Sequence, residues 1–251
     1  MIPRVIELDK HYVNYIFDLY GTLVDIRTDE RSPLFWRRMA ELYARFGADY
    51  TPAALRESYL RLCAEETERL RGITHYVNPE IDLTRVFRRL YEEAPRRRPA
   101  ALAPKEDGLE VWTSVLASAF RALSMKRLRL YPGVKRTLEA LRRRGCGVWL
   151  LSNAQRVFTV PELETLGLAD CFDAVYLSSD FGAAKPEPAF LAALLRERGL
   201  DPESCLFVGN DPDTDLAVAA ACSVDAVLYD TYGLARPGDR VIYRMEELLW
   251  I

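Results

Sequence analysis

The chain has 251 residues, of which 49% are hydrophobic and 28% charged, and its formal net charge is −3 at pH 7. This composition is ordinary for a globular protein with a sizeable core, and it excludes bulk electrostatic attraction to nucleic acid. The five cysteines are scattered and include no Cys-x-x-Cys pair, which argues against a disulfide framework or a zinc site and favours a cytoplasmic location. We find no apolar signal-peptide core and no run of membrane-spanning length, so no membrane partner is expected.

The first expected element is an apolar strand, Tyr12–Phe17, that ends in a carboxylate. Asp18 follows directly, and Tyr20-Gly21-Thr22 then supplies a turn with a glycine and a hydroxyl. A buried strand that ends in a polar loop places Asp18 at the carboxyl end of a sheet, where open α/β folds bind their ligands. An aspartate at that position can act as a nucleophile and form a covalent intermediate.

The next hundred residues have helical periodicity. Apolar residues recur at helical spacing over 34–46, and Thr51-Pro52 provides a hydroxyl cap and a first-turn proline for a helix that reaches Gly72. Asp82 caps a third helix, prolines predict a loop over 94–107, and a fourth helix is expected over 108–124. Roughly residues 28–126 are therefore expected to be all helix.

From Leu130 onward, short apolar strands alternate with helices. The expected strands are 147–151, 174–177, 206–208 and 226–229, and the expected helices are 133–145, 163–168, 186–198 and 215–221. This alternation predicts an α/β fold with a Rossmann-like, mostly parallel sheet covered on both faces. We expect a catalytic core of residues 1–27 and 128–251, with an all-helical cap domain, residues 28–127, inserted after the first strand. Such an insertion suits a lid that excludes water and selects substrate.

Polar residues also follow two of the later strands. Ser152 and Asn153 can hydrogen-bond an anionic substrate, although both residue types also favour helix caps and turns. Lys185 precedes a proline-started helix, where its charge can hold an anionic substrate and steady Asp18, or simply lie exposed.

Asp211 and Asp215 follow the strand expected at 206–208. Together with Asp18 they can complete a magnesium site, because Mg²⁺ prefers carboxylate and water oxygens. The alternative is that Asp211 caps the next helix and Asp215 complements its dipole.

Taken in order, these motifs resemble those of the haloacid dehalogenase superfamily of hydrolases, subfamily I with a helical C1 cap. The matching segments are Asp18-x-Tyr20-Gly21-Thr22-Leu23, Leu151-Ser152-Asn153, Lys185-Pro186-Glu187-Pro188 and Gly209-Asn210-Asp211-x-x-x-Asp215. The resemblance covers about residues 12–27 and 128–230, with the helical insert in the place of the cap.

The resemblance implies a role for each motif. Asp18 would be the nucleophile, Thr22 and Ser152 would bind the transferred group, and Lys185 would orient and neutralise it. Asp211 would complete the metal site. Further candidates for metal-site residues are Asn210, Asp215 and Tyr20, and Asn153 is a further candidate for substrate binding.

Tyr20 stands where phosphatases of this family usually carry a second aspartate, which protonates the leaving alkoxide and then activates water. General acid catalysis of this kind contributes about 10²–10⁴-fold. A tyrosine with its ordinary pKa of about 10 can donate a proton but is a poor base at neutral pH. The 2-haloacid dehalogenases of the family carry a tyrosine here, because a halide leaves without protonation.

Two other positions bear on this choice. The run Asp211–Asp215 resembles a metal site more than the Ser-Asn-type motif of the metal-independent dehalogenases, although Asn210 holds the place usual for an aspartate. Arg37 is the candidate for the cap arginine with which dehalogenases bind the substrate carboxylate, or an ordinary residue of an amphipathic helix. The tyrosine that dehalogenases carry shortly after Lys185 is replaced by Phe190 and Leu191.

We therefore predict a hydrolase that forms an aspartyl-enzyme intermediate. The leading prediction is a Mg²⁺-dependent phosphatase of a small, anionic, phosphorylated metabolite. One alternative is a metal-independent 2-haloacid dehalogenase, and the other is a catalytically inactive binding or regulatory protein with the same fold. No pattern predicts a particular oligomeric state.

Overall fold

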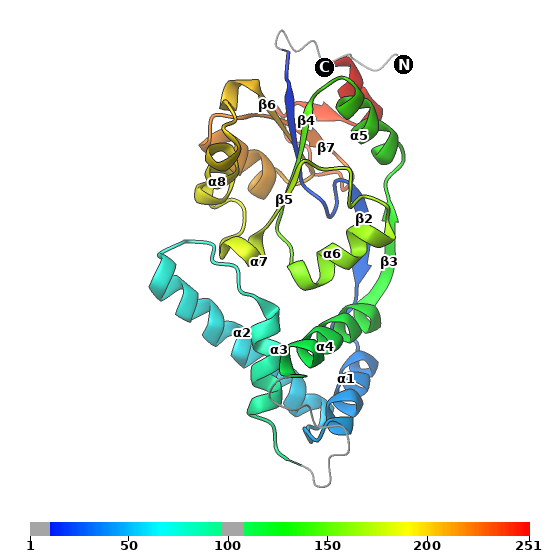
Figure 1. The fold of residues 1–251 in the computed structure, drawn as a ribbon, viewed down its shortest axis with the longest axis vertical. Coiled ribbons are helices and arrows are strands. Elements are labelled where there is room, and N and C mark those ends of the chain that lie inside the picture. The colour runs from blue at the N-terminus through cyan, green and yellow to red at the C-terminus, as the bar shows by residue number, and fades with distance from the viewer. Residues whose placement is uncertain (1–10, 97–107) are drawn as a thin grey trace.

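The structure is a computed structural model, and it describes residues 11–96 and 108–251. Figure 1 shows an elongated molecule with a sheet and its covering helices at one end and four helices, α1 to α4, at the other. The two ends are joined by the strands β2 and β3, and the C-terminus lies at the end far from the four helices. None of the helices in the described parts of the chain combines the length and apolarity needed to span a bilayer.

The main sheet has six strands in the order β5-β4-β1-β6-β7-β8, and every neighbouring pair is parallel. The strands are β1 (Asn14–Phe17), β4 (Gly147–Ser152), β5 (Ala174–Leu177), β6 (Cys205–Gly209), β7 (Asp225–Tyr229) and β8 (Val241–Ile242). The predicted α/β fold with a parallel sheet is thus confirmed. Because β1 lies between β4 and β6, Asp18, which follows Phe17, lies near the middle of the sheet edge formed by the carboxyl ends of the strands.

Each face of this sheet carries its own apolar cluster, because successive side chains of a strand point to opposite faces. Tyr15 and Phe17 pack on the face covered by α5 (Val134–Arg143) and η4 (Met245–Trp250). Ile16 packs on the opposite face with α8 (Pro188–Arg198) and α9 (Ala217–Ala221). The remaining short elements of the core are α6 (Arg156–Thr165), α7 (Ser178–Phe181), η2 (Pro202–Ser204) and the π-helical turn η3 (Pro212–Leu216).

The four helices of the cap surround a third apolar cluster rich in aromatic rings. They are α1 (Pro33–Arg45), α2 (Pro52–Thr74), α3 (Leu83–Glu92) and α4 (Leu109–Ser124). The predicted caps are confirmed, since Thr51 Oγ1 accepts the N–H of Ala54 at 3.2 Å and Asp82 Oδ1 accepts that of Thr84 at 2.9 Å. The separate clusters support the division into core and cap at 27/28 and 127/128, which stays a prediction.

The expectation that residues 28–126 hold only helices and no strand was wrong at both ends. The strands β2 (Val24–Thr28) and β3 (Met125–Leu130) pair into an antiparallel ribbon that carries both connections to the cap. Val24, Ile26, Leu128 and Leu130 alternate along the ribbon and pack on the core cluster, but the strands are short and charged residues stand between these apolar ones. Asp25 is buried and pairs with Arg127 at 2.8 Å and Arg129 at 2.9 Å.

Two further boundaries differ from expectation. Helix α6 begins at Arg156, whereas the helix was predicted to begin at residue 163. Pro161 lies inside the helix, and because a proline usually ends or breaks a helix, the prediction placed the start after it. The short strand β8 was not predicted, because two residues are too few for a pattern. The loop expected over 94–107 lies mostly outside the described residues.

Candidate active site

Asp18 lies at the carboxyl end of β1 with its carboxylate held from three sides. It is only 6% exposed, and its N–H donates to the carbonyl of Val208 at 3.0 Å. Oδ1 accepts from Lys185 Nζ at 2.7 Å and from Ser152 Oγ at 3.1 Å, and Oδ2 accepts from Thr22 Oγ1 at 3.0 Å. An ionised carboxylate has about four acceptor sites. The unused one is therefore on Oδ2, which leaves this oxygen able to meet a ligand.

The turn after Asp18 requires a glycine. Gly21 has φ of +94°, and a Cβ there would lie 2.6 Å from the side-chain amide of Asn210. The carbonyl of Gly21 also accepts a hydrogen bond from Thr231 Oγ1 at 2.6 Å. The turn after Asp18 is thus packed against the loop after β6 and hydrogen-bonded to the loop after β7.

Lys185 is buried between two carboxylates. Nζ donates to Asp18 Oδ1 at 2.7 Å, to Asp215 Oδ1 at 2.6 Å and to the carbonyl of Leu151 at 3.1 Å, so all three N–H groups are used. Burial opposes the charge of the ammonium, but attraction to Asp18 and Asp215 outweighs it and raises the pKa of Lys185. Two carboxylates facing one ammonium give this cluster a net charge of about −1.

Asp215 is almost fully buried and fixes the loop after β6. Its Oδ2 accepts the N–H groups of Asn210 at 2.9 Å and Asp211 at 3.1 Å. A side chain at Gly209 would overlap Asp215, so the glycine makes room for this carboxylate. Asn153 has a similar supporting position, since Oδ1 accepts the N–H of Lys185 at 2.7 Å and Nδ2 donates to its carbonyl at 3.0 Å.

A cavity of about 260 Å³ opens beside Asp18. Its described lining comes entirely from the core and consists of Asp18, Tyr20, Asn153, Lys185, Asn210, Asp211, Thr214, Asp215, Tyr232 and Leu234. Thr22 and Ser152 do not line the cavity; both are buried and donate hydrogen bonds to Asp18. Arg37 lies exposed on α1 and is not brought to this cavity, so its predicted contact with substrate stays a prediction without support from the geometry.

The carboxylates at this cavity suit a hard, oxygen-bound cation. Among the described residues, no three or more His, Cys, Asp or Glu side chains are grouped to hold a metal ion. Mg²⁺ keeps several waters and needs only one or two carboxylates from the protein. Within the described residues, the carboxylate of Asp211 accepts a single hydrogen bond, from the N–H of Asp213 at 2.8 Å, whereas both oxygens of Asp215 are engaged. Asp18 and Asp211 therefore fit the ion best, and the roles of Tyr20, Asn210 and Asp215 stay predictions.

The hydroxyl of Tyr20 is bound at the seam between core and cap. It donates to Glu162 Oε2 at 2.5 Å and lies 3.1 Å from Thr159 Oγ1, both on α6. Arg121 of α4 donates from Nε to Glu162 Oε1 at 2.6 Å, and its guanidinium carbon lies 5.3 Å from the centroid of the Tyr20 ring. Burial and the charge of Glu162 raise the pKa of Tyr20 well above its ordinary value, so the phenol keeps its proton.

Sequence reasoning missed these partners of Tyr20. Glu162 and Arg121 are 41 positions apart and neither belongs to a motif. Tyr232 and Leu234 were also missed, because they lie in a loop without a repeating pattern.

A second seam joins the cap to the loop that carries Lys185. Pro79 pairs with Ala183 as an antiparallel bridge between the α2–α3 connection and the core. The side chain of Gln155 accepts the N–H of Leu83 at 2.9 Å and donates to Glu80 Oε1 at 2.8 Å. Cap residues thus contact the core close to Lys185 without lining the cavity.

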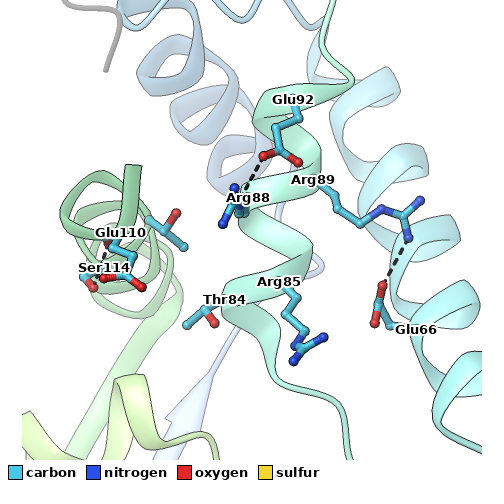
Figure 2. A pocket seen from close by; sticks show the side chains of 9 residues that line it. Glu66, Thr84, Arg85, Arg88, Arg89, Glu92, Glu110 and Ser114 are labelled. Atoms are coloured by element: carbon cyan, nitrogen blue, oxygen red, sulfur yellow. Dashed lines mark hydrogen bonds and ion pairs between the residues drawn. The ribbon is translucent and has the colours of Figure 1, made fainter. Parts of the chain in front are cut away.

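A wider hollow of about 710 Å³ lies on the cap, between α3 and its neighbours (Figure 2). Arg88 pairs there with Glu92 at 2.7 Å, and Arg89 pairs with Glu66 at 3.4 Å. The lining holds three arginines and three glutamates, so their charges cancel: Arg85, Arg88, Arg89, Glu66, Glu92 and Glu110. It shares no residue with the cavity beside Asp18, and we assign it no part in the chemistry.

A family model described as haloacid dehalogenase-like hydrolase matches residues 14–223. The chain belongs to this family. The predicted resemblance is thereby confirmed, and the four motifs of this haloacid dehalogenase-like hydrolase meet at the carboxyl edge of the sheet, around Asp18.

Curated relatives of the chain carry phosphatase names. It is 37% identical over 109 residues to a phosphoglycolate phosphatase of Yersinia pseudotuberculosis, covering 43% of this chain and 47% of the relative. It is 34% identical over 155 residues to a phosphoserine phosphatase of Thermus thermophilus, covering 62% of this chain and 56% of the relative. The chain thus spans about half the length of the curated relatives it matches.

Among solved structures, a 2-haloacid dehalogenase from Pseudomonas syringae aligns with a TM-score of 0.64 and 24% identity, covering 95% of this chain and 97% of that one. A phosphatase of the same family from Thermococcus onnurineus aligns with a TM-score of 0.56 and 22% identity, covering 94% and 95%. At this identity the likeness concerns the fold, which phosphatases and dehalogenases share.

Proposed function

We propose that this chain is a Mg²⁺-dependent phosphatase of a small phosphorylated metabolite that works through an aspartyl-phosphate intermediate. The observation that carries the proposal is the placement of Asp18, Lys185 and Asp211 around one cavity. The names of the curated relatives, phosphoglycolate phosphatase and phosphoserine phosphatase, agree with it. A cytoplasmic location, expected from the cysteine pattern, is part of the same proposal.

In this proposal Asp18 attacks the phosphorus of the substrate. The hydrogen bonds from Ser152, Thr22 and Lys185 fix the carboxylate before substrate arrives, so little reorganisation is needed in the reaction. The buried ammonium of Lys185 lies where negative charge builds up, and a fixed charge in a site shielded from water stabilises the transition state strongly.

Asp18 and Asp211 are the residues that would hold Mg²⁺. The ion, when bound, would neutralise charge on the phosphoryl oxygens. The alignment of the carboxylates does not depend on it, because Asp215 and Lys185 already fix the loop after β6 and the position of Asp18.

Tyr20 favours a second candidate, the metal-independent 2-haloacid dehalogenase. A halide leaves without a proton, so a tyrosine that donates none would serve as well as any residue. Such an enzyme must also bind a substrate carboxylate, and Lys185 is the only cation in the described lining of the cavity. This second candidate therefore lacks the counter-charge that its substrate needs.

The test measures phosphate release from 4-nitrophenyl phosphate with and without Mg²⁺, beside halide release from 2-chloropropionate. We expect phosphate release that requires Mg²⁺ and is lost in Asp18→Asn and Asp211→Asn. Asp213→Asn is the matched control, because its side chain is 73% exposed and pairs with Arg236 outside the cavity. Halide release that resists a chelator would instead establish the dehalogenase, and no turnover by a folded protein would favour the binding protein.

A further inference from the structure

We propose that the site is specific for phosphoryl substrates whose leaving group departs as an anion without being protonated. Aryl, enol and acyl phosphates belong to this class, whereas alkyl phosphates do not. This inference rests on the proposed phosphatase function. It follows from which groups at the cavity have a proton that they can donate to the leaving group.

The proton of Tyr20 is committed to another partner. A phenol has one proton, and that of Tyr20 is donated to Glu162 at 2.5 Å. Glu162 also accepts the guanidinium of Arg121, at 2.6 Å on Oε1 and at 3.3 Å on Oε2, so both of its oxygens already face donors. Tyr20 contributes to the lining of the cavity but directs its proton into the seam between core and cap.

The other groups at the described lining offer no better acid. Asp215 also lines the cavity, but both of its oxygens accept N–H groups, from Lys185 on Oδ1 and from Asn210 and Asp211 on Oδ2. Lys185 uses all three N–H groups on Asp18, Asp215 and Leu151. Asp18 and Asp211 act as nucleophile and metal ligand in the proposed function, so both must be ionised.

Tyr232 is the one remaining phenol in the described lining, and 54% of its surface is exposed. Burial of its inner part raises the pKa of Tyr232 to about 12, which makes it a weaker acid than an ordinary tyrosine. Its exposed position makes it simple to test by substitution.

The bond changes then balance without a protein acid. A carboxylate oxygen of Asp18 forms a bond to phosphorus, and the bond from phosphorus to the leaving oxygen breaks with its electron pair staying on that oxygen. Water then attacks phosphorus, the bond from Asp18 to phosphorus breaks, and phosphate and the free carboxylate result, with the proton of the water passing to phosphate or solvent. The first step is fast only when the departing oxygen anion is stable in water.

Two side chains of the cavity lining agree with this class. Tyr232 and Leu234 contribute an aromatic and an aliphatic side chain to the described lining, and these suit a planar apolar group. A carboxylate on the leaving group would find no cation in the described lining other than Lys185, which is already paired twice.

The test is the dependence of kcat/KM on the leaving group, because this ratio reports the step in which that group departs. The series runs from 4-nitrophenyl phosphate through phenyl phosphate to the alkyl esters phosphoglycolate and phosphoserine, with Mg²⁺ present. We expect kcat/KM to fall steadily as the leaving group becomes more basic. The alkyl esters should lie at least about 10²-fold below phenyl phosphate, the smallest factor that general acid catalysis usually supplies.

Two variants identify a hidden acid. Tyr20→Phe and Tyr232→Phe should each change kcat/KM by one common factor across the series and leave its slope unaltered. Selective slowing of the alkyl esters in either variant would identify that tyrosine as a general acid and overturn the inference. Since Tyr232 is exposed, its variant and the wild-type series remain informative if Tyr20→Phe fails to fold.

The inference and the proposed function fail in different ways. Equal kcat/KM for aryl and alkyl esters would overturn the inference and leave the phosphatase standing. Absence of phosphate release from every member of the series, by a folded protein with Mg²⁺, would overturn the phosphatase and the inference together.

Discussion

Asp18 and Tyr20 are two residues apart on one turn, yet they belong to two different buried networks. Asp18 shares the ammonium of Lys185 with Asp215, and this network borders a cavity and carries an excess of negative charge. Tyr20 joins the ion pair of Glu162 with Arg121, where the charges balance and the hydroxyl is enclosed. The surroundings of a side chain therefore decide whether it can react, more than its position in a motif does.

The unbalanced network is the one suited to chemistry. A buried carboxylate without a full counter-charge destabilises the fold, and such costs are found at functional sites. The balanced network is instead suited to stabilising the contact between core and cap. Substitutions at four positions test this contrast.

Asp18→Asn should separate activity from stability. Loss of the nucleophile should lower kcat by about 10⁴-fold or more, since the remaining groups supply only binding and electrostatic help. The thermal midpoint should stay equal or rise, because the substitution removes one of two carboxylates that share a single ammonium. Thermal unfolding and phosphate release measured on the same preparation check this. A clearly lowered midpoint would show that Asp18 stabilises the fold.

Asp215→Ala should act in the opposite sense on stability. It removes the second carboxylate of Lys185 and the acceptor for two N–H groups, and breaking a buried pair in this way costs about 3–5 kcal/mol. Urea unfolding measures the loss. Asp213→Ala, two positions away and exposed, serves as the control and should unfold like the parent. Equal stability of the two variants would contradict the role of Asp215.

Glu162→Gln tests the balanced network. The variant keeps the shape of the side chain but loses the charge that holds Arg121 and Tyr20, and a hydrogen bond to a charged group contributes about 1.5–3 kcal/mol. Urea unfolding should show a loss of that size. Glu92→Gln removes the partner of Arg88 on the exposed surface of α3 and should have a smaller effect. A larger effect of Glu92→Gln would refute the special position of the seam.

Glu80→Gln tests the second seam through pH. Burial raises the pKa of Glu80 in the folded state, although hydrogen bonds from Ser178 and Gln155 oppose the shift. The folded protein therefore holds this proton more tightly than the unfolded chain, so the stability contribution is present at low pH. It is lost as the pH rises through the unfolded pKa of Glu80 to its raised folded value.

The measurement is the difference in unfolding free energy between Glu80→Gln and the parent at several pH values. We expect this difference to move in favour of the variant as the pH rises from about 4 to 7, the range that begins near the ordinary glutamate pKa of about 4.3. A difference that is constant with pH would mean that Glu80 has the same pKa in both states.

The site residues at the strand ends were predictable, whereas the partners of Tyr20 were not. Asp18 directly follows β1, Ser152 is the last residue of β4, and Asp211 lies two residues after β6. Parallel strands bring their carboxyl ends to one edge of a sheet. Glu162 and Arg121 meet only through the packing of α6 against α4, which no local pattern encodes. The ribbon of β2 and β3 was missed because its apolar residues are few and alternate with charged ones, and because its two strands pair across about a hundred residues of the chain.

The loop after β7 supplies Tyr232 and Leu234 to the cavity and is tied to the nucleophile turn by the bond from Thr231 to Gly21. Substrate preference is therefore open to change by single substitutions at solvent-exposed positions that leave the cap and the buried charges in place. Protein engineering can start from these two positions, and a library at residues 232 and 234 would sample new leaving groups at little risk to folding.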